Sequence, residues 1–202
     1  MAAVRDGYRG FAEFWQLPFG HQEGLDMFRH VAQVPLLAPK PTRSRASVRA
    51  QLGLRQDQPA LLLSFRGNIS EAAIARARQD ASRYAFLDMG QTMQSHPDLS
   101  FSDLAGACDL LIGKLGYGLV AACVANQWRL LHIAREGFRE DVITRAEAPR
   151  YTCLQEMPHA DFAAGRWATH LDTLLSAPMP ASSLLATGAR ECTERILSHL
   201  KP

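Results

Sequence analysis

The sequence lacks a long hydrophobic run that is free of charged residues. Its most apolar stretch, residues 105–125, contains Asp109 and Lys114, whereas a membrane-spanning helix needs about 20 predominantly apolar residues. The first residues show no secretory signal, because Arg5 and Asp6 appear before any apolar segment. These absences predict a soluble, cytoplasmic protein without a transmembrane segment, in which residues 105–125 form a buried strand and a helix.

An excess of charge of one sign is also missing. The 22 lysines and arginines and the 20 acidic residues leave a net charge of +2. Proteins dedicated to nucleic-acid binding neutralise phosphates with clustered basic side chains, so no nucleic-acid partner is expected. The densest basic stretch, residues 40–49, is interrupted by Pro41 and polar residues, and we interpret it as a solvated linker.

Neither the cysteines nor the histidines have the spacing of a metal site. No two of the four cysteines are separated by two residues, and the seven histidines include no H-E-x-x-H pair. We therefore expect no metal ion and no cofactor, and cysteines that act as small buried hydrophobic residues. No serine lies in a G-x-S-x-G motif, which argues against a hydrolase. We expect His132 to be a satisfied core histidine, and His159 and Asp161 to be capping and surface residues.

The first 43 residues differ from the rest of the chain. Six of the 16 aromatic residues lie in the first 28 positions, and Tyr8, Phe11 and Trp15 have helical spacing that predicts one apolar stripe. Prolines 39 and 41 indicate a linker. We therefore divide the chain into residues 1–43, the remnant of an N-terminal domain plus linker, and a domain of residues 44–202. The aromatic residues between positions 8 and 28 are candidates for contact with an acceptor-binding subunit or a second copy.

Residues 44–202 alternate between buried strands and helices. This alternation predicts an α/β fold, a Rossmann-like parallel sheet with helices on both faces. We predict a loop at residues 91–100, after a strand of residues 84–87 that Gly90 terminates. The predicted strands span residues 59–65, 84–87, 109–112, 129–134 and 151–154, and the main predicted helices span residues 70–82, 102–107, 119–126, 161–164, 167–175 and 189–200.

The segment from Gly113 to Gly118 is the strongest local signal. It joins a predicted buried strand to a helix. Helix N-termini present unpaired N–H groups and partial positive charge, glycine lets a phosphate approach the backbone, and Lys114 would add a full charge. The G-x-x-G-x-G spacing matches neither the dinucleotide fingerprint nor the phosphate loop. From this local pattern, phosphate binding and simple turn geometry are equally supported.

A second group of candidates follows the next predicted strand. Arg135 can neutralise phosphate, and the carboxylate of Glu140 can accept hydrogen bonds from sugar hydroxyls. In parallel sheets, ligands bind at the carboxyl ends of the strands, which places this group near the glycine segment. The alternative is a helix start with acidic residues in its first turn, and the local pattern favours it.

Three segments carry a resemblance to a known family. They read G-K-L-G-Y-G at residues 113–118, R-E-G-F-R-E at residues 135–140 and D-F-A-A-G-R-W at residues 161–167. Together they resemble the C-terminal, donor-binding domain of GT-B glycosyltransferases, in the subgroup that includes predicted bacterial glycosyltransferases and the N-terminal part of arabinose kinases. The likeness covers roughly residues 30–200.

The resemblance implies a domain that binds a nucleotide-diphosphate sugar as substrate, with UDP among the candidate nucleotides. Gly116, Tyr117 and Gly118 would hold the diphosphate, together with Lys114. Gly67 would allow close approach from the turn after the first strand of the domain. Hexosyl transfer would need an acceptor-binding domain or partner, so the chain is expected to be inactive alone.

The same resemblance places Arg135, Phe138 and Glu140 near the donor sugar or ribose. The sequence departs from the family pattern at Arg66, where relatives often carry a second glycine, and at Ala122, where relatives usually carry a glutamate that contacts the ribose. A degenerate, non-catalytic Rossmann-like interaction module is therefore the alternative function. A sugar-nucleotide epimerase of the related two-domain fold is a third.

Overall fold

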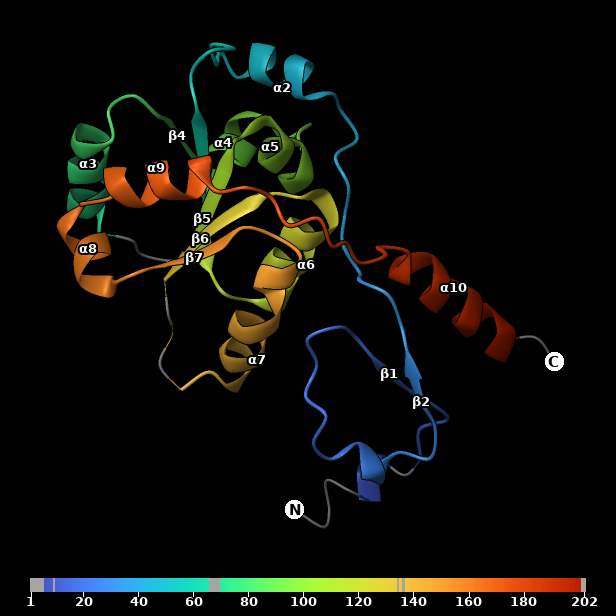
Figure 1. Cartoon of the computed structure of the whole chain (residues 1–202). Coiled ribbons are helices and arrows are strands. Elements are labelled where there is room, and N and C mark those ends of the chain that lie inside the picture. The colour runs from blue at the N-terminus through green and yellow to red at the C-terminus, as the bar shows by residue number, and fades with distance from the viewer. Residues whose placement is uncertain (1–5, 9, 66–69, 134, 136, 201–202) are drawn as a thin grey trace.

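The computed structural model describes residues 6–8, 10–65, 70–133, 135 and 137–200. Figure 1 shows an α/β body and, apart from it, a small lobe formed by the N-terminal residues. The last helix, α10 (Gly188–His199), extends from the body toward this lobe. No helix of the described residues has the length and apolar character needed to cross a membrane.

The body is built on one sheet of five parallel strands, in the order β4-β3-β5-β6-β7. Parallel strands joined by helices are the arrangement of Rossmann-like folds, so the predicted fold class is confirmed. The central strand is β5, from which the predicted glycine segment leaves. The strands are β3 (Ala60–Ser64), β4 (Ala85–Asp88), β5 (Leu110–Lys114), β6 (Arg129–Ile133) and β7 (Leu154–Met157).

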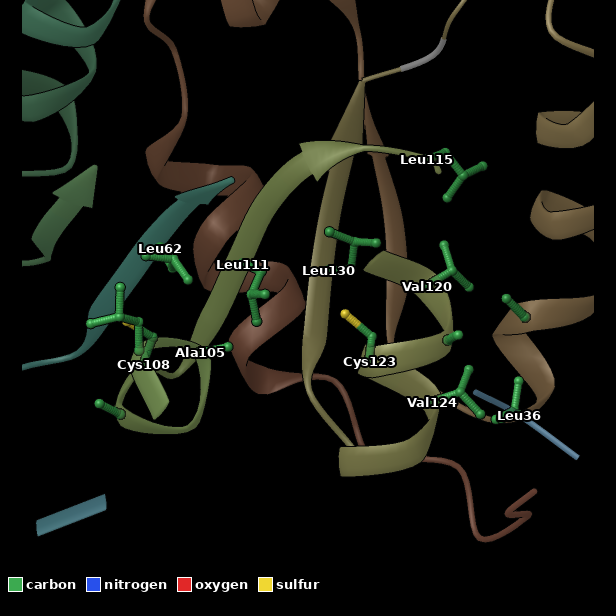
Figure 2. Packing of buried hydrophobic residues seen from close by; sticks show 14 of the residues in the cluster. Leu36, Leu62, Ala105, Cys108, Leu111, Leu115, Val120, Cys123, Val124 and Leu130 are labelled. Carbon is green, nitrogen blue, oxygen red and sulfur yellow. The ribbon is translucent and has the colours of Figure 1, made fainter. Parts of the chain in front are cut away.

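Helices cover both faces of this sheet and create two hydrophobic cores. Alternate strand residues point to opposite faces, so Leu62, Leu111 and Leu130 enter one core while Leu61 and Leu131 enter the other. Figure 2 shows the first core, where α6 packs on β5 and β6. The first face carries α2 (Arg45–Gln51), α4 (Met89–Ser95), α5 (Phe101–Ala107), α6 (Tyr117–Asn126) and α7 (Arg139–Glu147), and the second carries α3 (Glu71–Asp80), α8 (His159–Ala164) and α9 (Ala168–Ser176).

Two elements of the body differ from the sequence prediction. Residues 91–100 are not all loop, because the side chain of Asp88 caps a helix, α4, by accepting the N–H of Gln91 at 2.9 Å. Strand β7 begins three residues later than predicted, at Leu154. The preceding residues form a 3₁₀ turn, η2 (Ala148–Arg150), which the N–H of Tyr151 closes by donating to the carbonyl of Ala148.

The N-terminal lobe contains a pair of short parallel strands, β1 (Phe14–Gln16) and β2 (Val31–Gln33), and the 3₁₀ helix η1 (Leu25–Met27). The predicted helical stripe through Tyr8, Phe11 and Trp15 is wrong, because Trp15 lies in β1. Pairing with β2 satisfies its backbone, and the ring of Phe14 stacks on that of Phe28 at 4.1 Å. The aromatic residues therefore pack through strand pairing, not along one helix face.

The basic stretch at residues 40–49 is not a solvated linker throughout. Arg49 is 1% exposed, and its guanidinium donates to the carbonyls of Ala107 at 2.8 Å and Gln58 at 2.6 Å. Arg45 bonds to the carbonyl of Cys108 and to Asp109. Both arginines occupy positions beside the end of α5, where helix carbonyls have no partner within the helix.

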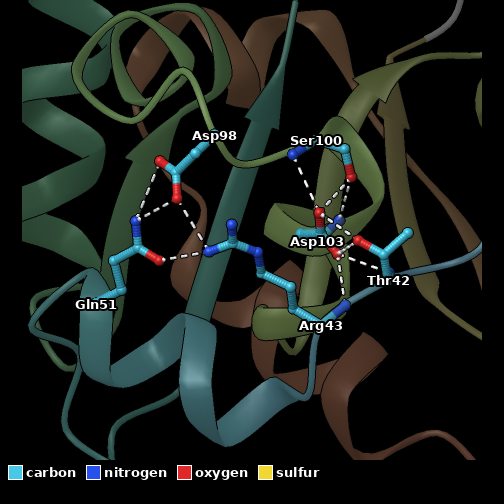
Figure 3. Close-up of polar contacts among 6 residues, drawn as sticks. All are labelled: Thr42, Arg43, Gln51, Asp98, Ser100 and Asp103. Carbon is cyan, nitrogen blue, oxygen red and sulfur yellow. Dashed lines mark hydrogen bonds and ion pairs between the residues drawn. The ribbon is translucent and has the colours of Figure 1, made fainter.

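The start of this stretch is bonded to α5 by Asp103, which is buried. The carboxylate accepts the N–H groups of Thr42 at 2.7 Å and Arg43 at 3.0 Å, and it completes a capping box with Ser100 (Figure 3). Exposed polar contacts join Arg43 to Asp98 in the same view. The division that we predict at residue 43 therefore lies where the chain is bonded to the body.

The segment before Thr42 is also packed against the body. Leu36 is fully buried in the first core, its N–H donates to the carbonyl of Leu185, and its carbonyl accepts the N–H of Gly188. A Cβ at Gly188 would lie 2.3 Å from the carbonyl oxygen of Pro35, so only glycine fits this approach. The segment around Leu36, which leads into the body, is thus paired with the segment around residues 185–188, which leads out of it.

Candidate anion-binding site at the carboxyl edge of the sheet

The predicted glycine segment forms the turn between β5 and α6. Strand β5 ends at Lys114, Gly116 is the N-cap residue with extended backbone (φ −97°, ψ 148°), and α6 begins at Tyr117. Gly116 supplies no side-chain cap, so the first N–H groups of this ten-residue helix depend on other partners. The partial positive charge of the helix N-terminus therefore lies at the carboxyl edge of the central strand.

The three glycines around this turn differ in whether the structure requires glycine at their position. A Cβ at Gly113 would lie 2.5 Å from Cδ2 of Leu119 and 3.2 Å from the carbonyl oxygen of Ser64, so this glycine lets α6 pack closely on the sheet. A Cβ at Gly116 or Gly118 would have no heavy atom within 4 Å among its described surroundings, and neither residue has a positive φ. Packing and backbone conformation thus require glycine at residue 113 alone of the three.

The first N–H group of α6 is occupied by a side chain of the next helix. The backbone N–H of Tyr117 donates to Oε1 of Glu140 at 2.6 Å. A carboxylate at this place is stabilised by the hydrogen bond and by the helix dipole. The following two N–H groups, those of Gly118 and Leu119, have no side-chain acceptor among the described residues.

Arg135 joins the same two loops by a second contact. Its guanidinium donates to the carbonyl of Leu115 at 2.8 Å and is paired with the buried carboxylate of Asp141. The hydrogen bond to Asp141 is the largest cause that raises the pKa of Arg135. The guanidinium also lies over the ring of Phe138, 4.0 Å from its centroid. In this arrangement the charge of Arg135 is compensated by Asp141.

The remaining residues that the sequence associates with the site lie in different surroundings. Lys114 is exposed and makes no ion pair with the described residues, so its ammonium is available to a ligand. Gly67 lies outside the described residues. Ala122 is 1% exposed within α6, and its methyl group offers no acceptor to a ribose.

An open hollow of about 490 Å³ lies beside the first turns of α7. It includes Arg135 and Phe138 but not Lys114, Glu140 or the residues of the β5–α6 turn. The predicted site residues are therefore distributed over two neighbouring places, the N-terminus of α6 and the hollow at α7. The hollow is lined by Arg135, Gly137, Phe138, Arg139, Asp141, Val142, Arg145 and Ala146.

His132 belongs to a polar row that the sequence analysis missed. The register of the strands aligns Ser64, Gly113, His132 and Glu156 across the sheet, two residues beyond the leucines of the first core. His132 is 1% exposed and is thus a core histidine as expected, but its Nδ1 has no partner among the described residues. Burial lowers its pKa. The signal was available in the sequence, as a polar residue at the period-two position of a buried strand.

Asp161 is more than the capping and surface residue that was expected. Its carboxylate accepts two hydrogen bonds from Arg166 and lies 3.0 Å from Nε2 of His170. The hydrogen bond with His170 is the largest cause that lowers the pKa of Asp161. This cluster joins α8 to α9, and no nucleophilic side chain is bonded to it among the described residues.

Comparison with known proteins shows a distant similarity to a plant enzyme. No family model matches the chain. It is 26% identical over 189 residues to the L-arabinokinase of Arabidopsis thaliana, a match that covers 84% of this chain and 18% of that relative. The chain thus spans about a fifth of the length of the curated relative that it matches. The similarity agrees with the resemblance to arabinose kinases, and it does not show a GT-B glycosyltransferase domain.

Proposed function

We propose that this chain binds a nucleotide-diphosphate sugar at the N-terminus of α6, as the donor-binding domain of a glycosyltransferase. The observation that carries the proposal is the placement of Gly116 and Gly118. Both face open space at a helix N-terminus on the carboxyl edge of the central strand, and packing requires neither. Within a helix, as at Gly118, glycine costs about 1 kcal/mol relative to alanine, and the approach of an outside phosphate explains its presence there. At the N-cap position of Gly116, glycine carries no such cost.

The chemistry would use the backbone more than side chains. The N–H groups of Tyr117, Gly118 and Leu119, the helix dipole and Lys114 would stabilise the negative charge of the diphosphate. In transfer, the bond from the anomeric carbon to the diphosphate oxygen breaks, and the acceptor oxygen bonds to that carbon. The proton of the acceptor would pass to a base outside residues 44–202. The similarity to L-arabinokinase supports a sugar-related ligand.

The proposal extends to domain organisation. We propose that residues 1–43 belong to, or contact, an acceptor-binding part of the whole protein, and that residues 44–202 form the donor-binding domain. A hollow of about 280 Å³ in the lobe is lined mainly by aromatic residues, among them Tyr8, Phe11 and Trp15. Phe11 is 57% exposed, which leaves apolar surface for such a contact.

A non-catalytic interaction module is the second candidate function. Ala122 is buried where a ribose acceptor is expected, and Glu140 already occupies the N–H of Tyr117. In this alternative Glu140 satisfies the first N–H group of α6 within the chain, and no nucleotide is needed for that group.

Calorimetric and thermal-shift titrations with UDP, GDP, TDP and their sugars test the proposal. We expect one nucleotide to raise the melting temperature, because a ligand that binds the folded state stabilises it. Gly118→Ala should raise the stability of the free chain through helix propensity and yet weaken nucleotide binding, and Gly118→Val should abolish binding.

Gly90→Ala is the matched control, because Gly90 is the second residue of α4 as Gly118 is of α6. It should change stability in the same direction and leave binding unchanged. Absence of binding by every nucleotide at millimolar concentration would overturn the proposal and favour the interaction module.

A further inference from the structure

Two hydrogen bonds connect the β6–α7 loop and the first turn of α7 to the β5–α6 turn and the start of α6, one on each side of Gly116. Before Gly116, the carbonyl of Leu115 accepts from Arg135 at 2.8 Å, and after it the N–H of Tyr117 donates to Glu140 at 2.6 Å. The bond to Asp141, which is 2% exposed, fixes the guanidinium of Arg135. The loop that leads into α7 is therefore anchored, and the carboxylate of Glu140, in the first turn of α7, is directed to the N-terminus of α6.

A diphosphate at this N-terminus and the carboxylate of Glu140 would compete for the same place. Both are anions, and both bind to unpaired N–H groups at the positive end of the helix. A phosphate oxygen on the N–H of Tyr117 would bring two negative charges within hydrogen-bond distance, where like charges repel strongly. Glu140 and the ligand thus cannot share this N–H group.

We propose that Glu140 is an intramolecular anion that closes the donor site of the free chain and leaves the N–H of Tyr117 when a diphosphate binds. The inference rests on the proposed function. Glu140 is the second residue of α7, so rotation of its side chain opens the site without movement of the helix. The released carboxylate can then accept a hydrogen bond from a hydroxyl of the bound sugar, which is the role that its sequence context predicts.

The test is the affinity of the full chain for inorganic pyrophosphate and for the nucleotide, measured by calorimetry. Pyrophosphate is used because it lacks the sugar, so loss of a contact between Glu140 and the sugar does not affect it. We expect pyrophosphate to bind about tenfold more tightly to Glu140→Ala than to the natural chain, since a charge-assisted hydrogen bond of this kind is worth about a factor of ten. Glu140→Gln keeps an acceptor for Tyr117 and should give a smaller increase.

Glu147→Gln is the matched control, because it removes the same charge from the exposed far end of α7. Its pyrophosphate affinity should equal that of the natural chain. As an independent readout, hydrogen exchange at the amide of Tyr117 should be faster in Glu140→Ala than in the natural chain when no ligand is present.

The outcomes separate the two proposals. If the natural chain binds the nucleotide and Gly118→Val does not, but Glu140→Ala binds pyrophosphate equally well or less well, the role of Glu140 is refuted and the donor site stands. An unchanged exchange rate at Tyr117 also refutes that role. If neither the natural chain nor any Glu140 variant binds either ligand, the donor site itself fails, and the role of Glu140 fails with it.

Discussion

The carboxylate of Asp103 accepts the backbone N–H of Thr42 at 2.7 Å, across 61 positions of sequence. Burial by itself would raise the pKa of Asp103, but hydrogen bonds from the Ser100 side chain and from the N–H groups of Thr42, Ser100 and Arg43 hold the pKa well below its usual range. The ionised form is therefore the one that connects the chain before α2 to α5.

Asp103→Asn is expected to lower the free energy of unfolding at pH 7 by about 2 kcal/mol, because hydrogen bonds to a charged acceptor are replaced by weaker ones. Since the folded pKa is depressed, the stabilisation is complete above the unfolded pKa of about 3.9 and is lost as the pH falls toward the folded pKa. Urea denaturation at pH 7 and pH 3 checks this, and the difference between the two proteins should shrink at pH 3. Asp98→Asn, at an exposed neighbour in the same cluster, should have little effect at either pH.

Asp80→Ala is expected to destabilise the start of α9, which is bonded to the end of α3 through this side chain. The carboxylate of Asp80 accepts the N–H groups of Trp167 and Ala168, each at 2.7 Å, and so acts as the cap that α9 lacks in its own sequence. Loss of a helix cap costs about 1–2 kcal/mol. Urea denaturation measures the change, and Asp57→Ala, an exposed surface substitution, should leave the midpoint unchanged. Equal midpoints for Asp80→Ala and the natural chain would contradict the capping role.

Alanine substitution at three glycines should follow the order of their contacts. Gly188→Ala meets two backbone carbonyls, at 2.3 Å and 2.8 Å, and should destabilise the chain by about 2–3 kcal/mol or more. Gly113→Ala meets mainly the flexible end of Leu119 and should cost about 1–2 kcal/mol. A Cβ at Gly116 meets nothing within 4 Å, so Gly116→Ala should have the smallest effect, about 1 kcal/mol or less, from placing alanine at an N-cap.

Differential scanning calorimetry of the three glycine variants gives this order. The double substitution Gly113→Ala with Leu119→Ala should couple, such that the second change costs less in the presence of the first. Additive effects would show that Leu119 is not the group that Gly113 accommodates.

The stability of the chain should depend on His132 between pH 7 and pH 5. Burial lowers the pKa of this side chain in the folded state, an effect that nearby Glu156 partly opposes. A depressed pKa means that the contribution of His132 is present above the unfolded pKa of about 6.5 and is lost as the pH falls below it. His132→Leu should therefore lose less stability than the natural chain between pH 7 and pH 5. A parallel decline of the two proteins would show that other groups cause the loss.

The sheet could be predicted from the sequence because its signals are local. The apolar run of β3, the cap at Ser70 and the strand–glycine–helix transition at Gly113 each depend on a few neighbouring residues. Trp15 shows the limit of such signals. Its helical spacing with Tyr8 exists in the sequence, but its conformation is determined by pairing with Ala32 of β2, 17 positions later.

The contacts of the candidate site could not be predicted for the same reason. Glu140 and Tyr117 lie 23 positions apart, and their hydrogen bond exists only because β5 and β6 are adjacent. The buried position of Arg49 likewise depends on carbonyls from Gln58 and from Ala107, 58 positions away. From composition, residues 40–49 are basic and polar. Whether an arginine in this stretch is buried depends on which backbone carbonyls the fold leaves without a partner.

The pairing of Leu36 with Leu185 and Gly188 has a mechanical consequence. The segment that follows the lobe and the segment that precedes α10 are bonded to each other at Leu36, which is buried. The lobe and α10 are therefore attached to the body at the same point. The ion pair of Arg195 with Glu13, 3.0 Å long, adds a second tie between lobe and helix. We therefore expect a displacement of the lobe to be transmitted to α10 through these contacts.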